Sequence, residues 1–532
     1  MLDAMAAPHP ALEALEGVTT LPQAFQATCA SRADQLALRS LDGATELTFA
    51  EYAERVRAVA AGLAGLGVSR GDRVGLMLLN RPEFHYLDAA VMHLGATAFS
   101  VYATSSPEQI KYLFDSAAND VVITEQLFLD RVLAARGDEG PEHVICIDGE
   151  PRSGVLDLAA VEAGAPADFD FDATWQAVEP DDVLTLIYTS GTTGPPKGVE
   201  LTHAGTIAQW RGVAAVLPLR MGGRMISYLP MAHIADRTCS HYAQMMFGYE
   251  ITSIPDPTQI AAALVQVRPE FFGAVPRVAE KLKAAIEAGI AADPDENRRA
   301  AMNGAIALGI ERVKLEEEGR QMPEDMAAHH ALAEQNVLAP LRAKLGLDRA
   351  DWIMFGAAPL PLDVHRFLRG IGLATTEVFG MSESSCIATT YPPSENRIGT
   401  VGRAIPGVEL ALAEDGEVLL RGETVMRGYR GEPEKTAEAV DADGWLHTGD
   451  IGELDAEGNL RIIDRKKELI INAAGKNMSP ALIEGHIKGA HPLIGQAVVI
   501  GDGRPYNVAL LVLDPDAAAA TGASASDPAV LE

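Results

Sequence analysis

The spacing of apolar residues alternates between helical and strand-like along the first half of the chain. Thr48 and Glu51 form a capping-box pair, and the apolar side chains that follow fall on one helical face until Gly67. Residues 74–79 then predict a buried strand, and Pro82 opens a second amphipathic helix. Further short strands are predicted near residues 98–101, 121–124, 184–188, 225–229, 251–254, 271–275 and 353–355. This β-α-β alternation predicts an α/β fold of doubly wound, mostly parallel sheets.

Two later regions depart from the alternation. Residues 277–347 are helical almost throughout, and we expect an insert packed on the main domain rather than a partner-binding arm. Over residues 400–463, turn pairs such as Asp415-Gly416 separate short apolar runs, which predicts a β-rich subregion of hairpins. A helix, two strands and an alanine-rich tail follow. We therefore expect a large domain over residues 1–465 and a small, incomplete α+β domain over residues 466–532.

The segment YTSGTTGPPKG, residues 188–198, is the clearest chemical signal, with three glycines, four Ser or Thr hydroxyls and one lysine. It follows a predicted strand, and Thr202 can cap a helix beyond it, so we expect the loop to join strand to helix. Glycines let backbone N–H groups approach phosphate, and Lys197 supplies positive charge. The Walker A order is absent, because Lys197 lies between Pro196 and Gly198. A turn-rich surface loop is the alternative, but the ordered string favours nucleotide binding.

Composition narrows the function further. The chain has 532 residues, too many for one hydrophobic core, and 43 basic against 74 acidic residues give a net charge of −31. That charge disfavours nucleic-acid partners. The four cysteines are far apart and suggest neither disulfides nor a zinc site, which fits a reducing cytoplasm. We find no signal peptide and no apolar run of transmembrane length, and we expect a cytoplasmic protein.

Four later segments share their order and spacing with one known superfamily. They are FGMSE (379–383), WLHTGD (445–450), DRKK (464–467) and GKN (475–477). With the glycine loop they resemble the adenylate-forming, AMP-binding superfamily over nearly the whole chain. LPMAH (229–233), FGAVPRV (272–278) and GMSESS (380–385) are most similar to long-chain fatty acyl-CoA synthetases, including the bubblegum-like branch. The resemblance implies that a fatty acid, ATP and coenzyme A react, with Mg²⁺, to form an acyl-adenylate and then acyl-CoA.

The resemblance also implies which residues hold the nucleotide. Thr189 and Glu383 would hold Mg²⁺, an oxygen-only set that suits this ion. Phe379 would stack on adenine, with core packing as the alternative, and Asp450 and Arg465 would hold the ribose. Further nucleotide contacts are implied for Ser190, Gly191, Thr192, Thr193, Gly194, Gly356, Ala357, Ala358, Gly380 and Met381.

The catalytic residues that the resemblance implies are Lys197, Ser382, Glu383, His233 and Lys467. His233 would lie near the acyl carboxylate, and a packed histidine is an equally weighted alternative. Lys467 would be the hinge of a mobile C-terminal domain, with a solvated basic turn as the alternative. The loop around Gly475 would approach the pantetheine arm of coenzyme A.

The C-terminal end departs from the family pattern. Relatives have a near-terminal lysine that contacts the α-phosphate, whereas the only lysine after Lys476 is Lys488. We expect impaired adenylation, from either a fragment of a longer synthetase or a natural short form. Two other functions stay open: a pseudoenzyme that binds nucleotide or acyl-adenylate, and an acyl-AMP ligase that delivers to a carrier protein. Acyl chain length, oligomeric state and weak peripheral membrane association are also open.

Overall fold

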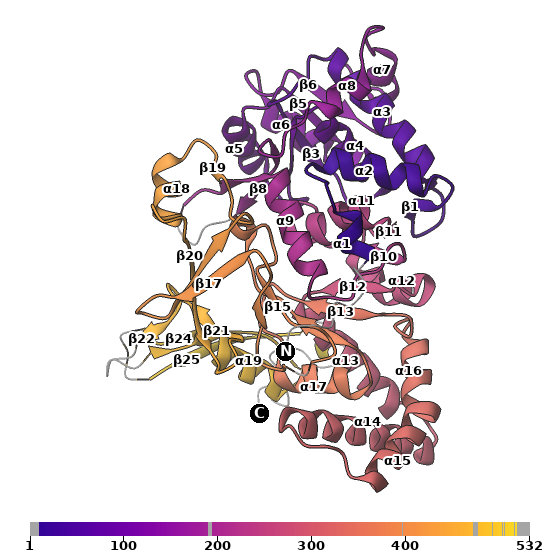
Figure 1. Cartoon of the computed structure of the whole chain (residues 1–532), viewed down its shortest axis with the longest axis vertical. Coiled ribbons are helices and arrows are strands. Elements are labelled where there is room, and N and C mark those ends of the chain that lie inside the picture. Colours follow the sequence, from indigo (N-terminus) through magenta and orange to yellow (C-terminus); the bar gives the residue numbers. More distant parts are fainter. Residues whose placement is uncertain are drawn as a thin grey trace.

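The computed structural model describes residues 10–189, 194–395, 397–471, 477–491, 493–502, 504, 506–514 and 517–518 (Figure 1). An eight-stranded sheet forms the centre of its N-terminal half. Neighbouring strands from β8 to β7 run parallel, and β9 and β19 extend one edge in antiparallel fashion. In spatial order the strands are β19 (Gly428–Tyr429), β9 (Lys197–Thr202), β8 (Val183–Thr189), β4 (Thr97–Ser100), β3 (Arg73–Met77), β5 (Val121–Thr124), β6 (His143–Cys146) and β7 (Leu156–Asp157).

The central strands are buried because helices cover both faces of the sheet. On β5, Val121 and Ile123 pack in the same core cluster as α3 (Phe49–Gly65) and α4 (Pro82–His93). Val122 points the other way and packs with α5 (Pro107–Ala117) and α6 (Gln126–Arg136). Figure 1 shows these two helix pairs on opposite sides of β3. The predicted class, α/β with doubly wound and mostly parallel sheets, is confirmed.

The predicted helix starts are also found. Thr48 Oγ1 accepts a hydrogen bond from Glu51 N at 3.3 Å, and Thr48 N donates to Glu51 Oε2 at 2.8 Å, which completes the capping box of α3. Pro82 is the first residue of α4, where a missing N–H costs no helical hydrogen bond. Local sequence therefore sets where both helices begin.

Three further sheets surround the site described below. One contains β10 (Arg224–Ser227), β11 (Glu250–Ser253), β1 (Leu36–Ser40) and β2 (Glu46–Thr48), and another β12 (Phe271–Ala274), β13 (Trp352–Phe355) and β14 (Thr375–Glu377). The third is antiparallel, with β17 (Val408–Leu412), β18 (Glu417–Gly422), β20 (Leu446–Leu454) and β21 (Leu460–Arg465). Its first hairpin turns at the predicted Asp415-Gly416 pair, where Gly416 has a φ of 84°. Short pairs complete the strands: β15 (Thr389–Thr390) with β16 (Arg403–Ala404), β22 (Ile470–Ile471) with β23 (Asn477–Met478), and β24 (Ile494–Ile500) with β25 (Val508–Leu513).

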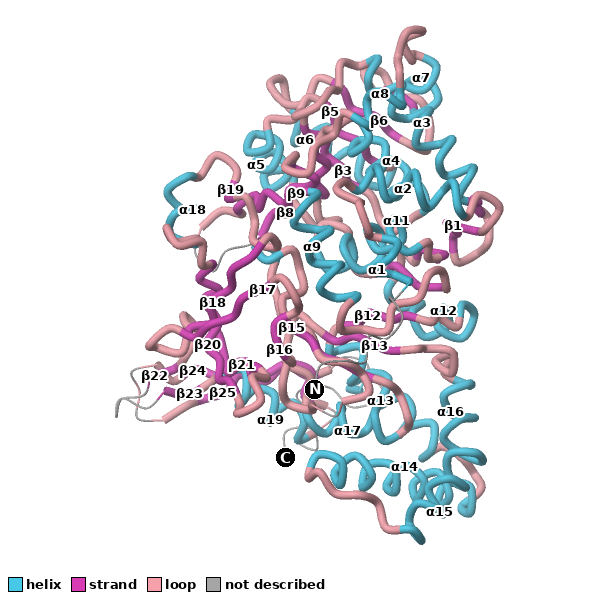
Figure 2. Tube along the Cα trace, viewed as in Figure 1, coloured by secondary structure: helices cyan, strands magenta, loops and turns pink. Residues whose placement is uncertain are grey.

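Figure 2 shows α13 to α17 gathered at one end of the molecule. Residues 277–347, predicted to be helical, contain most of α13 (Pro276–Ala291) and all of α14 (Glu296–Glu317), α15 (Glu324–Ala333) and α16 (Ala339–Lys344), and α14 packs on α17 (Leu362–Gly370). The contact is close, because a Cβ on Gly309 would lie 2.0 Å from the Gly370 carbonyl oxygen.

The remaining helices are α1 (Pro10–Ala14), α2 (Leu21–Ser31), α7 (Leu158–Ala163), α8 (Phe171–Gln176), α9 (His203–Ala214), α10 (Ile234–Asp236), α11 (Ala243–Phe247), α12 (Ile260–Val267), α18 (Pro433–Ala439) and α19 (Pro480–Ala490), with single turns η1 (Arg237–Tyr242), η2 (Pro257–Gln259), η3 (Glu334–Leu338) and η4 (Ser382–Ser384). Within the described residues, no helix is both long enough and apolar enough to span a bilayer.

The prediction that the glycine loop joins a strand directly to a helix is wrong. The loop connects β8 to β9, and Thr189 pairs with Lys197 across this antiparallel hairpin. Val199 and Leu201 are buried and alternate with polar residues, a period of two that places 197–202 in a strand. Thr202 does cap α9, since its Oγ1 accepts from Gly205 N at 3.1 Å, but only after β9 has ended.

Candidate active site

A cavity of about 990 Å³ lies where the four larger sheets meet. Strands β8, β9, β10, β12, β13, β18, β20 and β21 all contribute lining residues, and loops that follow the strands complete the wall. This is the position expected for a ligand site in an open α/β fold. The residues predicted from sequence that line it are Thr189, Lys197, His233, Gly356, Ala357, Gly380, Met381, Ser382, Glu383, Arg465 and Lys467.

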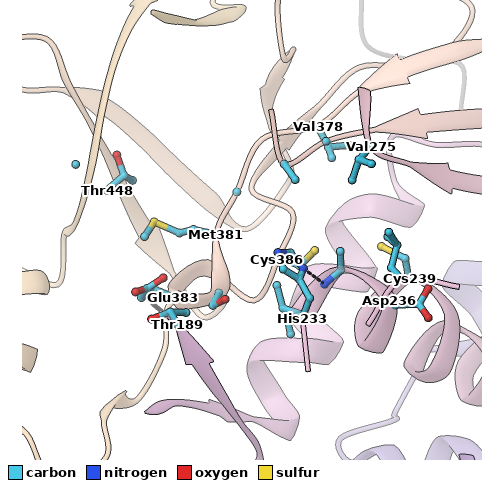
Figure 3. A pocket seen from close by; sticks show the side chains of 18 of the residues that line it. Thr189, His233, Asp236, Cys239, Val275, Val378, Met381, Glu383, Cys386 and Thr448 are labelled. Carbon is cyan, nitrogen blue, oxygen red and sulfur yellow. Dashed lines mark hydrogen bonds between the residues drawn. The ribbon is translucent and has the colours of Figure 1, made fainter. Parts of the chain in front are cut away.

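One end of the cavity carries the groups predicted to meet phosphate and metal. Thr189 is the last residue of β8 and Lys197 the first of β9. Glu383 lies on the short turn η4 and is buried, with 5% of its surface exposed, and Figure 3 shows it beside Thr189. Burial lowers the pKa of Lys197, while the negative charge of Glu383 opposes that shift. A cation and a carboxylate from separate segments therefore share this end.

Tyr429, which the sequence analysis did not single out, contacts both of these groups. Its hydroxyl donates a hydrogen bond to Glu383 Oε1 at 2.8 Å, and Lys197 Nζ lies 3.9 Å from its ring centroid. Tyr429 belongs to the two-residue strand β19 at the edge of the large sheet. No spacing rule connects it to Glu383, which is 46 positions away in the chain. Tertiary contacts bring them together: β19 pairs with β9, and Met426 N donates to the backbone oxygen of Glu383 at 2.8 Å.

His233 lies farther along the cavity and caps the short helix α10. Its Nδ1 accepts a hydrogen bond from Ala235 N at 3.1 Å, so the proton of the neutral ring is on Nε2 (Figure 3). The surrounding protein lowers the pKa of His233, although its ring is open to the cavity. A neutral imidazole that presents an N–H donor is compatible with a carboxylate ligand.

Asp236 is a second residue of the cavity that sequence reasoning missed. Its side chain is buried, and Oδ2 accepts hydrogen bonds from Asn80 Nδ2 at 2.9 Å and Ser227 Oγ at 2.7 Å. Burial raises the pKa of Asp236 to about 7, and these hydrogen bonds only partly oppose the shift. Figure 3 shows Asp236 and Cys239 at the opposite end from Glu383, with His233 and Cys386 between.

Asp450 and Arg465, the two residues predicted to hold the ribose, form an ion pair with each other. Arg465 Nε lies 2.9 Å from Asp450 Oδ1, and Arg465 lines the cavity while Asp450 is buried beside it. Burial raises the pKa of Asp450 to about 6, and the Arg465 charge opposes the shift. The neighbouring Lys466 also lines the cavity, and its ammonium is paired with Asp415 and Glu417, at 2.5 and 2.9 Å.

Some predicted nucleotide contacts do not lie on the cavity wall. Phe379 is half-buried and packs against the main hydrophobic core, and its backbone pairs with Thr389. Gly194 and Ala358 are described but are not among the lining residues. The predictions for Ser190, Gly191, Thr192, Thr193 and Gly475 fall outside the described residues.

The oxygen groups at Thr189 and Glu383 suit Mg²⁺ bound together with a nucleotide. No cluster of three or more His, Cys, Asp or Glu side chains that could cage a metal ion occurs in the part of the chain that is described. Mg²⁺ does not need such a cage, because it usually binds one or two carboxylates, substrate phosphates and water. Thr189 and the buried carboxylate of Glu383 line one cavity and meet that requirement.

The chain is similar to proteins of known family. The model of the AMP-binding enzyme family matches residues 25–430, and that of the AMP-binding enzyme C-terminal domain matches residues 467–530. The fadD11 protein of Mycobacterium tuberculosis is 52% identical over 383 residues, 71% of this chain and 67% of the relative. The long-chain-fatty-acid–CoA ligase ACSBG2 of Xenopus laevis is 33% identical over 528 residues, 94% of this chain and 70% of the relative.

Among solved structures, the anthranilate CoA ligase AuaEII in complex with anthranoyl-AMP superposes with a TM-score of 0.73 at 23% identity. The match covers 94% of this chain and 89% of AuaEII, and it shows a shared fold, in which a smaller C-terminal domain follows the large one.

Proposed function

Because the chain belongs to the AMP-binding enzyme family, we propose that it is a long-chain fatty acid–CoA ligase. The family predicted from the motifs is confirmed. The single observation that carries the proposed chemistry is that Lys197, Thr189 and Glu383, from three segments of the chain, line one end of one cavity. The two alternatives, a pseudoenzyme and a ligase serving a carrier protein, receive no support from relatives such as ACSBG2, which is named a CoA ligase.

In the first half-reaction, a carboxylate oxygen of the fatty acid attacks the α-phosphorus of ATP. The bond to the bridging oxygen breaks, and pyrophosphate leaves. Negative charge on the phosphate oxygens calls for fixed positive charge and donors, which Lys197 and Ser382 supply from the cavity wall. His233 presents its Nε2 proton toward the same space and would orient the attacking carboxylate.

Mg²⁺ would be held by Thr189 and Glu383 and, when bound, would neutralise charge on the phosphates. Gly356 and Ala357 line the cavity without bulky side chains and would leave room for the adenine. Arg465, already oriented by Asp450, would donate to the ribose hydroxyls.

In the second half-reaction, the coenzyme A sulfur attacks the acyl carbonyl carbon and AMP leaves. We propose that Lys467, at the cavity rim after β21, is the hinge for the domain movement between the two steps. This assignment, and those of the ribose and adenine contacts, are predictions to be tested by substitution.

The test is pyrophosphate release by the full chain with ATP, Mg²⁺, coenzyme A and palmitate. We expect release that depends on palmitate, at the reduced rate that the missing near-terminal lysine predicts, and we expect Glu383→Gln to abolish it, because the amide cannot replace a charged ligand of Mg²⁺. Lys111→Ala, on the exposed face of α5 and paired with Asp115, is the matched control and should behave as wild type. No palmitate-dependent release by the wild-type chain would contradict the assignment.

A further inference from the structure

The short strand β19 is hydrogen bonded to two parts of the candidate site. Tyr429 pairs with Val199 of β9, and Arg430 N donates to Gly198 O at 2.8 Å, next to Lys197. On the other side, Met426 N donates to the backbone oxygen of Glu383 at 2.8 Å. One segment of five residues, 426–430, therefore connects the strand that carries Lys197 with the turn that carries Glu383.

The Tyr429 side chain also contacts the side chains of both Glu383 and Lys197. Its hydroxyl donates to Glu383 Oε1 at 2.8 Å, which fixes the rotation of the carboxylate. The face of its ring lies 3.9 Å from Lys197 Nζ, a distance typical of a cation–π contact. The Tyr429 side chain is buried, with 7% of the residue exposed, whereas Lys197 is half-buried and faces the cavity.

The two groups that Tyr429 contacts attract each other. Burial lowers the pKa of Lys197 and the charge of Glu383 opposes that shift, yet no ion pair between these two described residues is formed. A direct pair would neutralise both charges and withdraw them from a ligand. The ring and hydroxyl of Tyr429 give each charge another partner and keep the two available to the cavity.

We propose that Tyr429 is a positioning residue for adenylation, which holds the metal-binding carboxylate of Glu383 and the phosphate-binding ammonium of Lys197 apart and in place. This inference rests on the proposed function, because it concerns the same site. It assigns two separable roles to one side chain: the hydroxyl acts on metal-dependent binding, and the ring acts on phosphate binding.

The roles are separated by two substitutions. Tyr429→Phe removes the hydroxyl and keeps the ring, whereas Tyr429→Leu removes both. Binding of ATP is measured by calorimetry with Mg²⁺ and again with a chelator in place of Mg²⁺. The thioester step is measured on its own, from synthetic palmitoyl-adenylate and coenzyme A. Tyr52→Phe is the matched control, since it removes a buried tyrosine hydroxyl that donates to His85 O at 3.1 Å, away from the cavity.

We expect Tyr429→Phe to weaken ATP binding about ten- to a hundredfold when Mg²⁺ is present, as substitution of a partner that orients a metal ligand usually does. Binding of metal-free ATP should stay close to wild type. Tyr429→Leu should in addition weaken metal-free ATP binding, by about two- to thirtyfold, because the cation–π contact to Lys197 is lost. In both variants, formation of palmitoyl-CoA from the adenylate should fall much less than ATP binding, because that step involves neither Mg²⁺ nor the β- and γ-phosphates.

Equal weakening of ATP binding by Tyr429→Phe with and without Mg²⁺ would overturn the proposal, and so would a matching loss in the thioester step. Both results would indicate a general structural role. Unchanged ATP binding in Tyr429→Phe would overturn it as well, even if Tyr429→Leu fails to fold. Failure of the proposed function is recognised separately, because wild-type chain would then release no pyrophosphate in response to palmitate.

Discussion

Asp236 makes the protein less stable as pH rises from about 4 to about 7, and replacing it should remove that dependence. Its carboxyl is buried beside the cavity, and only neutral donors, Asn80 and Ser227, reach Oδ2. The adjacent Arg237 gives no compensation because its guanidinium is paired with Asp88. Burial raises the pKa of Asp236 from its ordinary 3.8 to about 7, a difference of about 3 units, which corresponds to about 4 kcal/mol.

The direction in which the free energy of unfolding changes with pH follows from this raised pKa. Because the pKa of Asp236 is higher in the folded than in the unfolded protein, the folded protein binds more protons between about pH 4 and pH 7. The contribution of this group to the free energy of unfolding is complete below about pH 4. It then falls by about 1.4 kcal/mol for each pH unit up to about pH 7 and is constant above that.

Asp236→Asn keeps an oxygen acceptor for both donors but stays neutral at every pH. We therefore expect the free energy of unfolding of the variant, relative to wild type, to rise by about 2 kcal/mol between pH 5.5 and pH 8. The free energy of unfolding is measured by urea titration, followed by the fluorescence of tryptophans such as the buried Trp210. Asp115→Asn, on an exposed helix face, controls for the loss of one negative charge. A difference between Asp236→Asn and wild type that is the same at both pH values would refute the reasoning.

Three other substitutions test a buried ion pair, a helix cap and a charge on the cavity wall. Arg237→Met should cost about 3–5 kcal/mol of stability, because it leaves the buried carboxylate of Asp88 without its cation, and adding Asp88→Leu should recover most of that loss; a single-variant cost below about 1 kcal/mol in urea titrations would contradict it. Thr48→Ala should cost about 1 kcal/mol through the lost cap of α3, and an unchanged urea midpoint would mean that the capping box adds no stability. Lys435→Ala should raise the KM for ATP, because Lys435 lines the cavity and its charge adds to the burial that lowers the pKa of Lys197; an unchanged KM would show that its charge does not reach the nucleotide.

Features that depend on neighbours in sequence could be predicted. The capping box at Thr48, the helix start at Pro82 and the hairpin at Asp415-Gly416 each involve residues within a few positions, so the local chain contains all the atoms that decide them. The alternation of strands and helices was sufficient for the α/β class. The helix capped by Thr202 was predicted correctly, but its direct connection to the glycine loop was wrong, because the period-two burial of residues 197–202 was not recognised.

The candidate site could be predicted only in part. Motifs identified Thr189, Lys197 and Glu383, and the structure brings them to one cavity. Motifs also suggested Phe379, whose half-buried side chain packs against the core and is not among the lining residues, so its stacking on adenine stays a prediction.

The sequence by itself determined the elements, the fold class and the types of group available for phosphate chemistry, because these follow from local spacing and from motifs. Tertiary structure decided which groups touch. Tyr429 reaches Glu383 across 46 positions, and Asn80 reaches Asp236 across 156. Burial, not residue type, makes Asp236 titrate near neutrality, and Tyr429 contacts both Lys197 and Glu383, since desolvation and contact geometry exist only once distant segments have packed together.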